Sequence, residues 1–232
     1  MAQTGIDRKQ ASIKNKTLWF GNIKTNNLGF TLIELLIAMA ITTIVSAGIF
    51  SAYQNQQKAQ LAQKQIVEMQ QNLRVGKYFM TREIRMAGYD PEGTNGAGIV
   101  IAGDGSDASN RLIFTYFNAD AWNDGNDNDF DGTADQPGEN LQRIEYYLFD
   151  SLGDGTMDLG RREGARLDAI AENIQTLQFA YLDANGAVTA ILSDIRSIQI
   201  TLEATIDSNE TNYFNGKNRI LTTTVKCRNM GL

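Results

Sequence analysis

The chain has 232 residues, a formal net charge of −6 at pH 7, no histidine and one cysteine. This acidity argues against nucleic-acid binding, which requires clustered lysine and arginine to neutralise phosphates. The single cysteine, Cys227, permits no disulfide within the chain, and the absence of histidine removes the commonest acid–base catalyst and metal ligand.

A basic segment precedes the first long apolar run. Residues 1–29 hold five lysines or arginines against one aspartate, and removing this net charge of +4 leaves a chain of −10. Residues 30–50 read FTLIELLIAMAITTIVSAGIF, close to the roughly 20 apolar residues that cross a hydrocarbon layer of about 30 Å as a helix. The basic flank predicts that residues 1–29 stay cytoplasmic and that the rest is exported.

Glu34 is the only ionisable residue in this apolar run. A charged side chain at the centre of a membrane helix costs about 2.5 to 3.5 kcal/mol on insertion scales, so such a carboxylate needs a partner or a function. None of the sixteen residues that follow it is a cation. The alternative is that Glu34 lies near the helix end, four residues after Phe30, and reaches the membrane interface.

The junction Gly29-Phe30-Thr-Leu-Ile-Glu34 resembles the prepilin signature of type IV pilins and type II secretion pseudopilins. The resemblance implies that a membrane peptidase cuts after Gly29, on the cytoplasmic side, and methylates the new amino group of Phe30. It also implies that Glu34 pairs with the N-terminal amine of a neighbouring subunit. Such a charge-assisted hydrogen bond in a low dielectric would fix the stagger between subunits.

Three other interpretations of this segment are possible. An ordinary secretory signal would be cut after its apolar region, and Val45-Ser46-Ala47 offers a weak site for that, with Gly48 as the new terminus. A plain signal anchor would keep the helix but would not need Gly29-Phe30 or Glu34. A buried core helix fits least well, because the run is as long as a membrane span.

The helical pattern continues beyond the apolar run. Apolar or small residues recur at spacings of three and four, which predicts one buried face, and they are Ala62, Ile66, Met69, Leu73, Gly76, Met80 and Ile84. Gly88 and Pro91 are stop signals, so we expect one helix from about Phe30 to Met86. A coiled coil is the alternative, but the seam is short and Gly76 interrupts it, so packing against a head is favoured.

Residues 89–232, here called the head, are long enough for one domain. Short β-rich runs alternate with turn signals and predict strands at Gly98–Ala102, Arg111–Phe117, Leu141–Phe149, Ile174–Leu182, Ile195–Ile206 and Leu221–Lys226. Asn185-Gly186 predicts a hairpin turn. The expected fold class is α+β, with a long N-terminal membrane-spanning helix packed on an antiparallel β-sheet of the kind found in pilin heads. Residues 30–50 would form its membrane or filament half and residues 51–88 its amphipathic half.

Later motifs resemble PilW-type minor pilins, with the J-type pseudopilin of type II secretion as the nearest relative. They are the segments 69–74, 79–91, 154–161 and 171–179. The resemblance implies a non-enzymatic subunit that primes pilus assembly or belongs to the tip complex, with roles in adhesion and twitching motility. Implied partners are other minor and major pilins, a tip adhesin, the prepilin peptidase and the inner-membrane assembly platform. The head would be periplasmic before assembly and would then lie on the pilus.

An acidic loop, residues 120–139, forms the second chemical pattern. Four of its acids match calcium-loop positions 1, 3, 5 and 9, namely Asp127, Asp129, Asp131 and Asp135. Gly132 matches the turn position, but position 12 is Gly138 instead of glutamate. A poorer copy consists of Asp150, Asp154 and Asp158. Calcium here would be a structural ion, and the alternative is a solvated acidic turn.

Two function classes therefore remain. The first is a structural subunit of a pilus or pseudopilus, and the second is an exported, membrane-anchored module that binds calcium or mediates adhesion. An enzyme has little support, because the sequence offers no nucleophile elbow, phosphate loop or transition-metal site. Paired carboxylates from the two aspartate clusters could imitate those of a hydrolase only if a closed pocket brought them together.

Overall fold

The structure is a computed structural model. It describes residues 29–93, 96–101, 110–120, 125, 127, 132–134, 140–206, 211, 213 and 218–230. The chain forms two compact units, Met1–Phe50 and Ser51–Leu232, and each is described by itself.

One long helix, α1 (Leu32–Ile84), forms the N-terminal part of the described chain. The expected continuous helix is confirmed, two residues shorter at each end than predicted. At its C-terminal end the amide of Met86 donates to the carbonyl of Glu83 at 2.8 Å, and the amide of Ala87 donates to that of Ile84 at 3.1 Å. These bonds reach back three residues instead of four, so the α-helical pattern ends at Ile84.

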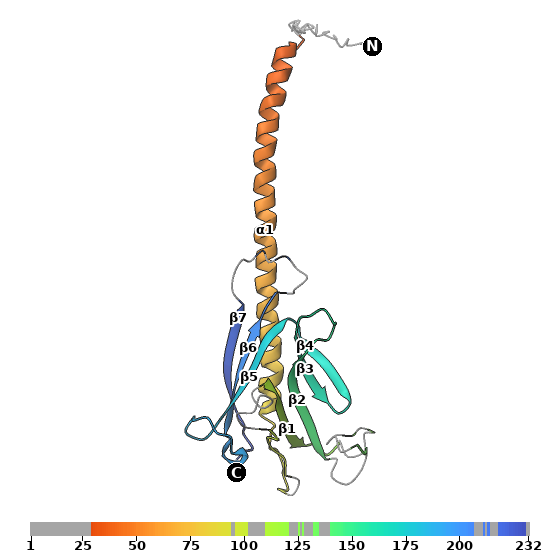
Figure 1. Cartoon of the computed structure of the whole chain (residues 1–232), viewed down its shortest axis with the longest axis vertical. Coiled ribbons are helices and arrows are strands. Elements are labelled where there is room, and N and C mark those ends of the chain that lie inside the picture. Colours follow the sequence, from red (N-terminus) through yellow and green to blue (C-terminus); the bar gives the residue numbers. More distant parts are fainter. Residues whose placement is uncertain are drawn as a thin grey trace, which may run out of the picture. The chain divides into compact units, whose positions relative to one another are not determined.

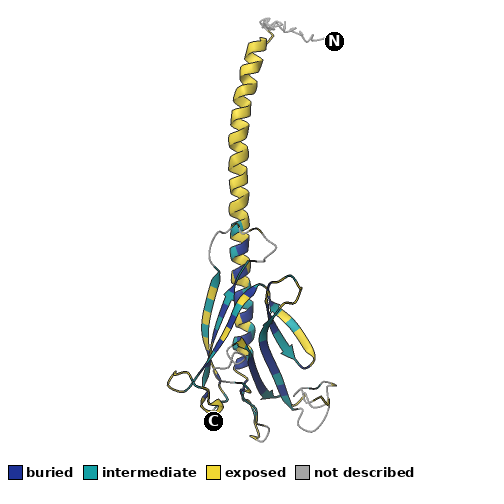
Figure 2. Cartoon of the chain, in the orientation of Figure 1, coloured by how far each residue is buried: buried dark blue, intermediate teal, exposed yellow. Residues whose placement is uncertain are grey.

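The second part of α1 buries the face that the sequence pattern predicted (Figure 2). Met69, Leu73, Met80 and Ile84 are buried, and the preceding apolar positions are half-buried. A Cβ atom added to Gly76 would lie 2.8 Å from Leu159 and 3.3 Å from Leu202, which belong to two different sheets. This face therefore packs against the head and not against a coiled-coil partner.

Two antiparallel sheets flank this part of α1 (Figure 1). The first has the order β1-β2-β3-β4, and its strands are β1 (Leu112–Phe117), β2 (Leu141–Phe149), β3 (Asp158–Glu163) and β4 (Arg166–Ala171). The second has the order β5-β6-β7, and its strands are β5 (Ile174–Leu182), β6 (Ser197–Ala204) and β7 (Arg219–Lys226). A short 3-10 helix, η2 (Leu192–Asp194), precedes β6. The apolar faces of both sheets and of α1 meet in one core.

The α+β architecture and five of the expected strands are confirmed. The strand expected at Ile195–Ile206 is shorter, Ser197–Ala204, because Ile195 follows η2 and the pairing with β7 ends at Ala204. The turn at Asn185-Gly186 is also confirmed, with Gly186 at a φ of +81° and its amide donating to the carbonyl of Asp183.

One prediction about the first sheet was wrong. Gly98–Ala102 is not a strand in its described part, since only Ile99 forms a bridge, to Phe114 on β1. The hairpin β3–β4 was not predicted, because half of its strand residues are charged and charged residues are uncommon in strands. Its strands form because β3 pairs with β2 over six positions and because its charges find partners in the core.

Candidate functional site

The candidate cleavage junction precedes the helix. Gly29 and Phe30 lie outside α1, which begins at Leu32, and the Phe30 side chain is 91% exposed. A Cβ atom added to Gly29 would meet no atom within 4 Å. The peptide bond between these residues is therefore free of tertiary contacts within the described chain.

Glu34 and Thr31 form a reciprocal cap at the start of α1. The Glu34 carboxylate accepts the Thr31 amide at 2.9 Å and the Thr31 hydroxyl at 3.0 Å, while the Glu34 amide donates to Thr31 Oγ1 at 3.3 Å. This is a capping box, in which two amides that lack helical partners are satisfied by side chains. A negative charge in the first turn also complements the helix dipole.

The cap was not predicted from the sequence, because Thr31 precedes Glu34 and is uncharged, whereas a charged partner was expected. The spacing Thr31-x-x-Glu34 before an apolar run is the signal that could have revealed it. Within the single chain, Glu34 thus has a neutral partner. Its carboxylate can still accept further hydrogen bonds from a cationic group of another molecule.

The rest of the first unit presents an almost wholly apolar surface. Every residue from Leu32 to Phe50 is exposed, and α1 is long and apolar enough to cross a membrane by length and composition. Thr42 and Thr43 donate their hydroxyls to the carbonyls of Ala38 and Met39 at 2.7 and 2.8 Å. Because these hydroxyls bond to the helix itself, they can lie in hydrocarbon without leaving an unpaired donor.

The first calcium candidate is only partly described. Asp129, Asp131 and Asp135 lie outside the described residues, whereas Asp127 accepts the amide of Gly132 at 2.8 Å. Gly132 has a φ of +98°, as the sharp turn of a calcium loop requires. Calcium binding at this loop remains a prediction.

The poorer copy serves its own loop. Asp150 accepts the amides of Gly153 and Gly155 at 2.7 and 3.0 Å, and Asp154 accepts the amide and hydroxyl of Thr156. Asp158 is buried and accepts amides from Ser151 and Asn173. Among the described residues, no three acidic or cysteine side chains gather in a way that could hold a metal ion.

A polar network connects the end of α1 to the first sheet. Arg161 on β3 donates from Nε to both carboxylate oxygens of Glu83 on α1, at 2.9 and 3.0 Å, and from a terminal nitrogen to Glu163. The Tyr146 hydroxyl donates to Glu83, and burial, followed by the Glu83 charge, raises the pKa of Tyr146 well above its usual range. Burial lowers the pKa of Arg161, but its hydrogen bonds to Glu83 and Glu163 outweigh that effect and raise it. No local sequence pattern indicates this network, because Glu83, Tyr146 and Arg161 are far apart in the chain.

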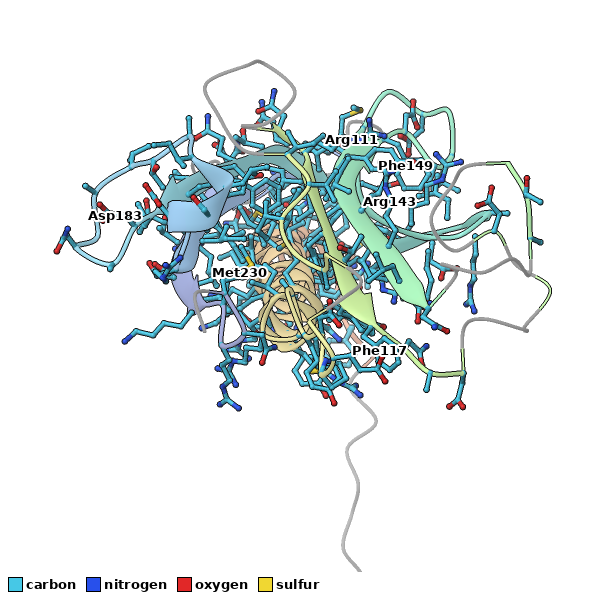
Figure 3. All side chains as sticks on the ribbon, turned by 90° about the horizontal axis from the view of Figure 1, so that it is seen from below. Arg111, Phe117, Arg143, Phe149, Asp183 and Met230 are labelled. Atoms are coloured by element: carbon cyan, nitrogen blue, oxygen red, sulfur yellow. The ribbon has the colours of Figure 1, made fainter. Side chains whose placement is uncertain are left out.

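A second ionic cluster surrounds Glu145 on β2. Arg111 and Arg143 contact the buried carboxylate of Glu145 at 3.0 and 2.9 Å, and the Arg111 guanidinium lies 5.0 Å from the centre of the Tyr147 ring (Figure 3). Both arginines are therefore committed to internal contacts. This cluster holds β1 against β2.

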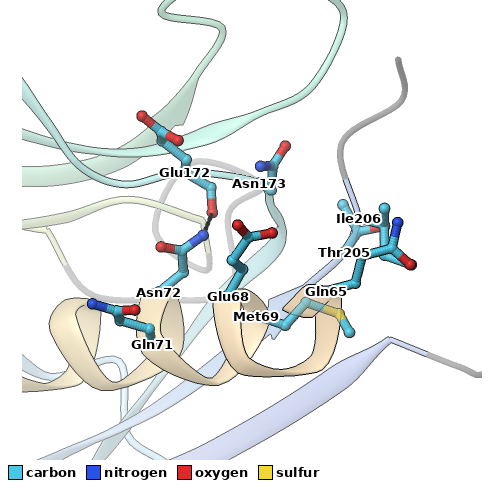
Figure 4. A pocket seen from close by; sticks show the side chains of 9 residues that line it. All are labelled: Gln65, Glu68, Met69, Gln71, Asn72, Glu172, Asn173, Thr205 and Ile206. Carbon is cyan, nitrogen blue, oxygen red and sulfur yellow. Dashed lines mark hydrogen bonds between the residues drawn. The ribbon is translucent and has the colours of Figure 1, made fainter. Parts of the chain in front are cut away.

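A polar pocket lies between α1 and the ends of β4 and β6 (Figure 4). Asn72 on the helix donates to the carbonyl of Glu172 at 2.8 Å, and the amide of Thr205 donates to the carbonyl of Asn173 at the same distance. The buried Gln65, which also lines the pocket, binds residues 211 and 213 through its side-chain amide group. These contacts are made by amides and backbone carbonyls, so the residues that line the pocket serve to link the helix to the sheets.

Comparison with known proteins bears on the N-terminal segment. Residues 24–50 match the model of the prokaryotic N-terminal methylation motif, and no curated protein sequence matches the chain. The motif covers Gly29, Phe30 and Glu34 together with the exposed apolar part of α1. The match supports a type IV pilin-like or pseudopilin protein, that is, a structural subunit with a prepilin signal and an apolar helix.

Proposed function

We propose that this protein is a minor pilin of a type IV pilus, cut after Gly29 and acting in the priming of assembly or in the tip complex. The observation that supports this most strongly is the joint arrangement at the start of α1. The methylation motif contains an exposed Gly29-Phe30 peptide. It is followed by nineteen exposed residues from Leu32 to Phe50, which include the carboxylate of Glu34.

Cleavage would create an amino group at Phe30, which the peptidase would methylate. In the free subunit the Glu34 carboxylate accepts hydrogen bonds from the amide and the hydroxyl of Thr31, so this carboxylate has hydrogen-bond donors while the subunit lies in the membrane. On assembly, the amine of a neighbouring subunit would contact Glu34 as well. The added charge-assisted hydrogen bond in a low dielectric would stabilise the stacked arrangement and fix its register.

The proposed location follows from this mechanism. Before assembly the apolar part of α1 would lie in the inner membrane with the head in the periplasm, and the subunit would then join the pilus. Its partners would be other minor and major pilins, a tip adhesin, the prepilin peptidase and the assembly platform of the inner membrane.

The test is pilus assembly in the native host with Glu34 and Thr31 variants. We expect Glu34→Ala and Glu34→Gln to be processed and to reach the membrane but to fail in assembly, because both lack the charge. Thr31→Ala removes only the cap and weakens the helix start by about 1 kcal/mol, so assembly should persist. Normal piliation with Glu34→Gln would contradict the amine-pairing mechanism.

Two alternatives make different predictions. A J-type pseudopilin would share processing and the Glu34 requirement, but its deletion would abolish secretion and leave pili intact. An exported calcium-binding or adhesive module would need only the anchor, so its function would survive Glu34→Ala.

A further inference from the structure

The loop between β5 and β6 exposes an aliphatic cluster. Val188, Ile191 and Leu192 are 77%, 59% and 42% exposed, whereas the β6 residues that follow them alternate regularly into the core. Three exposed aliphatic side chains within five residues are unusual on a soluble surface unless they contact something. We call these three residues the aliphatic cluster.

The loop that carries the cluster is held rigidly. Asp183 accepts the amides of Asn185 and Ala187 through one carboxylate oxygen, at 2.8 and 2.9 Å. The amide of Thr189 donates to the carbonyl of Tyr181 at 2.9 Å, and the amide of Ile191 donates to the Thr189 hydroxyl at 3.1 Å. A preorganised apolar loop loses little conformational entropy on binding, which favours a docking role.

A basic hollow adjoins the cluster. It lies between the turn 183–186 and the C-terminal end of β7, and the charged residues that line it are Asp183, Arg196, Lys226 and Arg228. Figure 3 places Asp183 on the projecting loop. Within the described chain, none of the three cations forms an ion pair, and the Asp183 carboxylate is occupied by loop amides.

Arg196 connects the two features. Its guanidinium donates to the carbonyls of Ser193 and Ile195, at 2.7 and 2.9 Å, and its own carbonyl accepts the Cys227 amide at 3.0 Å. It therefore lies against the turn that carries Leu192 and beside the strand end that carries Lys226 and Arg228. Arg196 thus links the cluster to the hollow, and we call the residues of both together the loop surface.

We infer that the loop surface docks a different protein whose contact region carries aliphatic side chains beside carboxylates. Charge complementarity identifies this occupant, because three cations that form no ion pair with any described residue lie in a hollow of an otherwise acidic chain. A protruding carboxylate fits a concave basic site, whereas a membrane surface is flat, and the cluster lacks the aromatic residues typical of interfacial anchors. The inference concerns a surface separate from the Glu34 segment.

The test uses the full chain in its native host, with a photoreactive residue in place of Ile191. The control carries the same group in place of Ile220, an aliphatic residue on β7 that is 65% exposed. We expect a protein crosslink from position 191 and not from 220, and mass spectrometry should locate it in a peptide that contains aliphatic and acidic residues. Failure of Phe30 methylation would contradict the proposed function while leaving this result intact.

Charge reversal provides the second arm. Lys226→Glu with Arg228→Glu should reduce the crosslink from position 191 several-fold, whereas Arg166→Glu, an exposed cation on β4, should leave it unchanged. Protection of the buried Cys227 thiol from alkylation shows that each variant is folded. The inference would be overturned by a crosslink to phospholipid or to a second copy, or by equal crosslinking from position 220. It would also be overturned by the absence of any crosslink, or by a crosslink that charge reversal does not reduce.

Discussion

Arg161 on β3 contacts both carboxylate oxygens of Glu83 on α1, at 2.9 and 3.0 Å, across the boundary between helix and sheet. Both side chains are mostly buried, with 13% and 21% of their surfaces exposed. The contact joins the last turn of the helix to a strand that has little intrinsic strand propensity. It therefore stabilises the part of the fold that was hardest to predict.

Glu83→Ala should destabilise the unit Ser51–Leu232 by about 2 kcal/mol, because a hydrogen bond to a charged group is lost and Arg161 keeps only Glu163. Urea denaturation of the full chain in detergent, followed by circular dichroism, measures this change. Asp168→Ala is the control, since it breaks the exposed pair with Arg166 and should cost less than about 1 kcal/mol. Equal losses for the two variants would contradict the role of the network.

Gly76→Val should also destabilise this unit, by more than about 1 kcal/mol. Even a Cβ atom at Gly76 would lie 2.8 Å from Leu159, and overpacking a core costs about 1 to 3 kcal/mol. Gly48→Val is the matched control on the same helix, because no atom lies within 4 Å of its Cβ position. If Gly76→Val proved as stable as the native chain in the same denaturation experiment, the close contact with both sheets would be refuted.

The contrast between these two sites shows what local sequence could predict. The positions of Met69, Leu73 and Met80 followed from helical periodicity alone, because one face of a helix must be apolar to be buried. Gly76 belongs to the predicted buried face and interrupts a coiled-coil seam, but the pattern did not indicate its close contact with Leu159 and Leu202.

The Glu83 network joins residues that are 63 and 78 positions apart in the chain, which no local pattern encodes. In the candidate site, the residue types at Gly29, Phe30 and Glu34 could be recognised from spacing. The Thr31 cap needed a test for capping boxes, which the sequence also allowed. The basic hollow could not be predicted, because it requires Arg196 and Arg228 to meet through the pairing of β6 with β7.

Cys227 should resist alkylation in the folded protein. Burial raises the pKa of its thiol to about 11, so the reactive thiolate is scarce near neutral pH. The pKa of this thiol is higher in the folded than in the unfolded state. The contribution of the protonated, buried thiol to folding stability is therefore fully present below pH 9 and is lost as pH rises toward 11. Iodoacetamide labelling at pH 8, with and without urea, measures this. Rapid labelling of the native chain would contradict the burial of Cys227.

Calcium should raise the thermal unfolding midpoint if the acidic loop 120–139 binds it. At calcium about 100 times the dissociation constant, binding to the folded state alone contributes roughly 2.7 kcal/mol. The double variant Asp127→Asn with Asp131→Asn should remove the calcium-induced shift. Asp150→Asn should lower the midpoint but leave the calcium-induced shift unchanged, because Asp150 supports its own loop. Identical midpoints in calcium and in chelator would refute calcium binding.

We propose that the chain is processed as a prepilin at Gly29 and keeps its apolar helix. Intact-mass and N-terminal peptide spectrometry of the protein from membranes of its native host tests this. We expect a mature chain that begins at Phe30 with one methyl group on its amine. A terminus at Gly48, or an uncut leader, would contradict it and would leave an exported or anchored acidic domain.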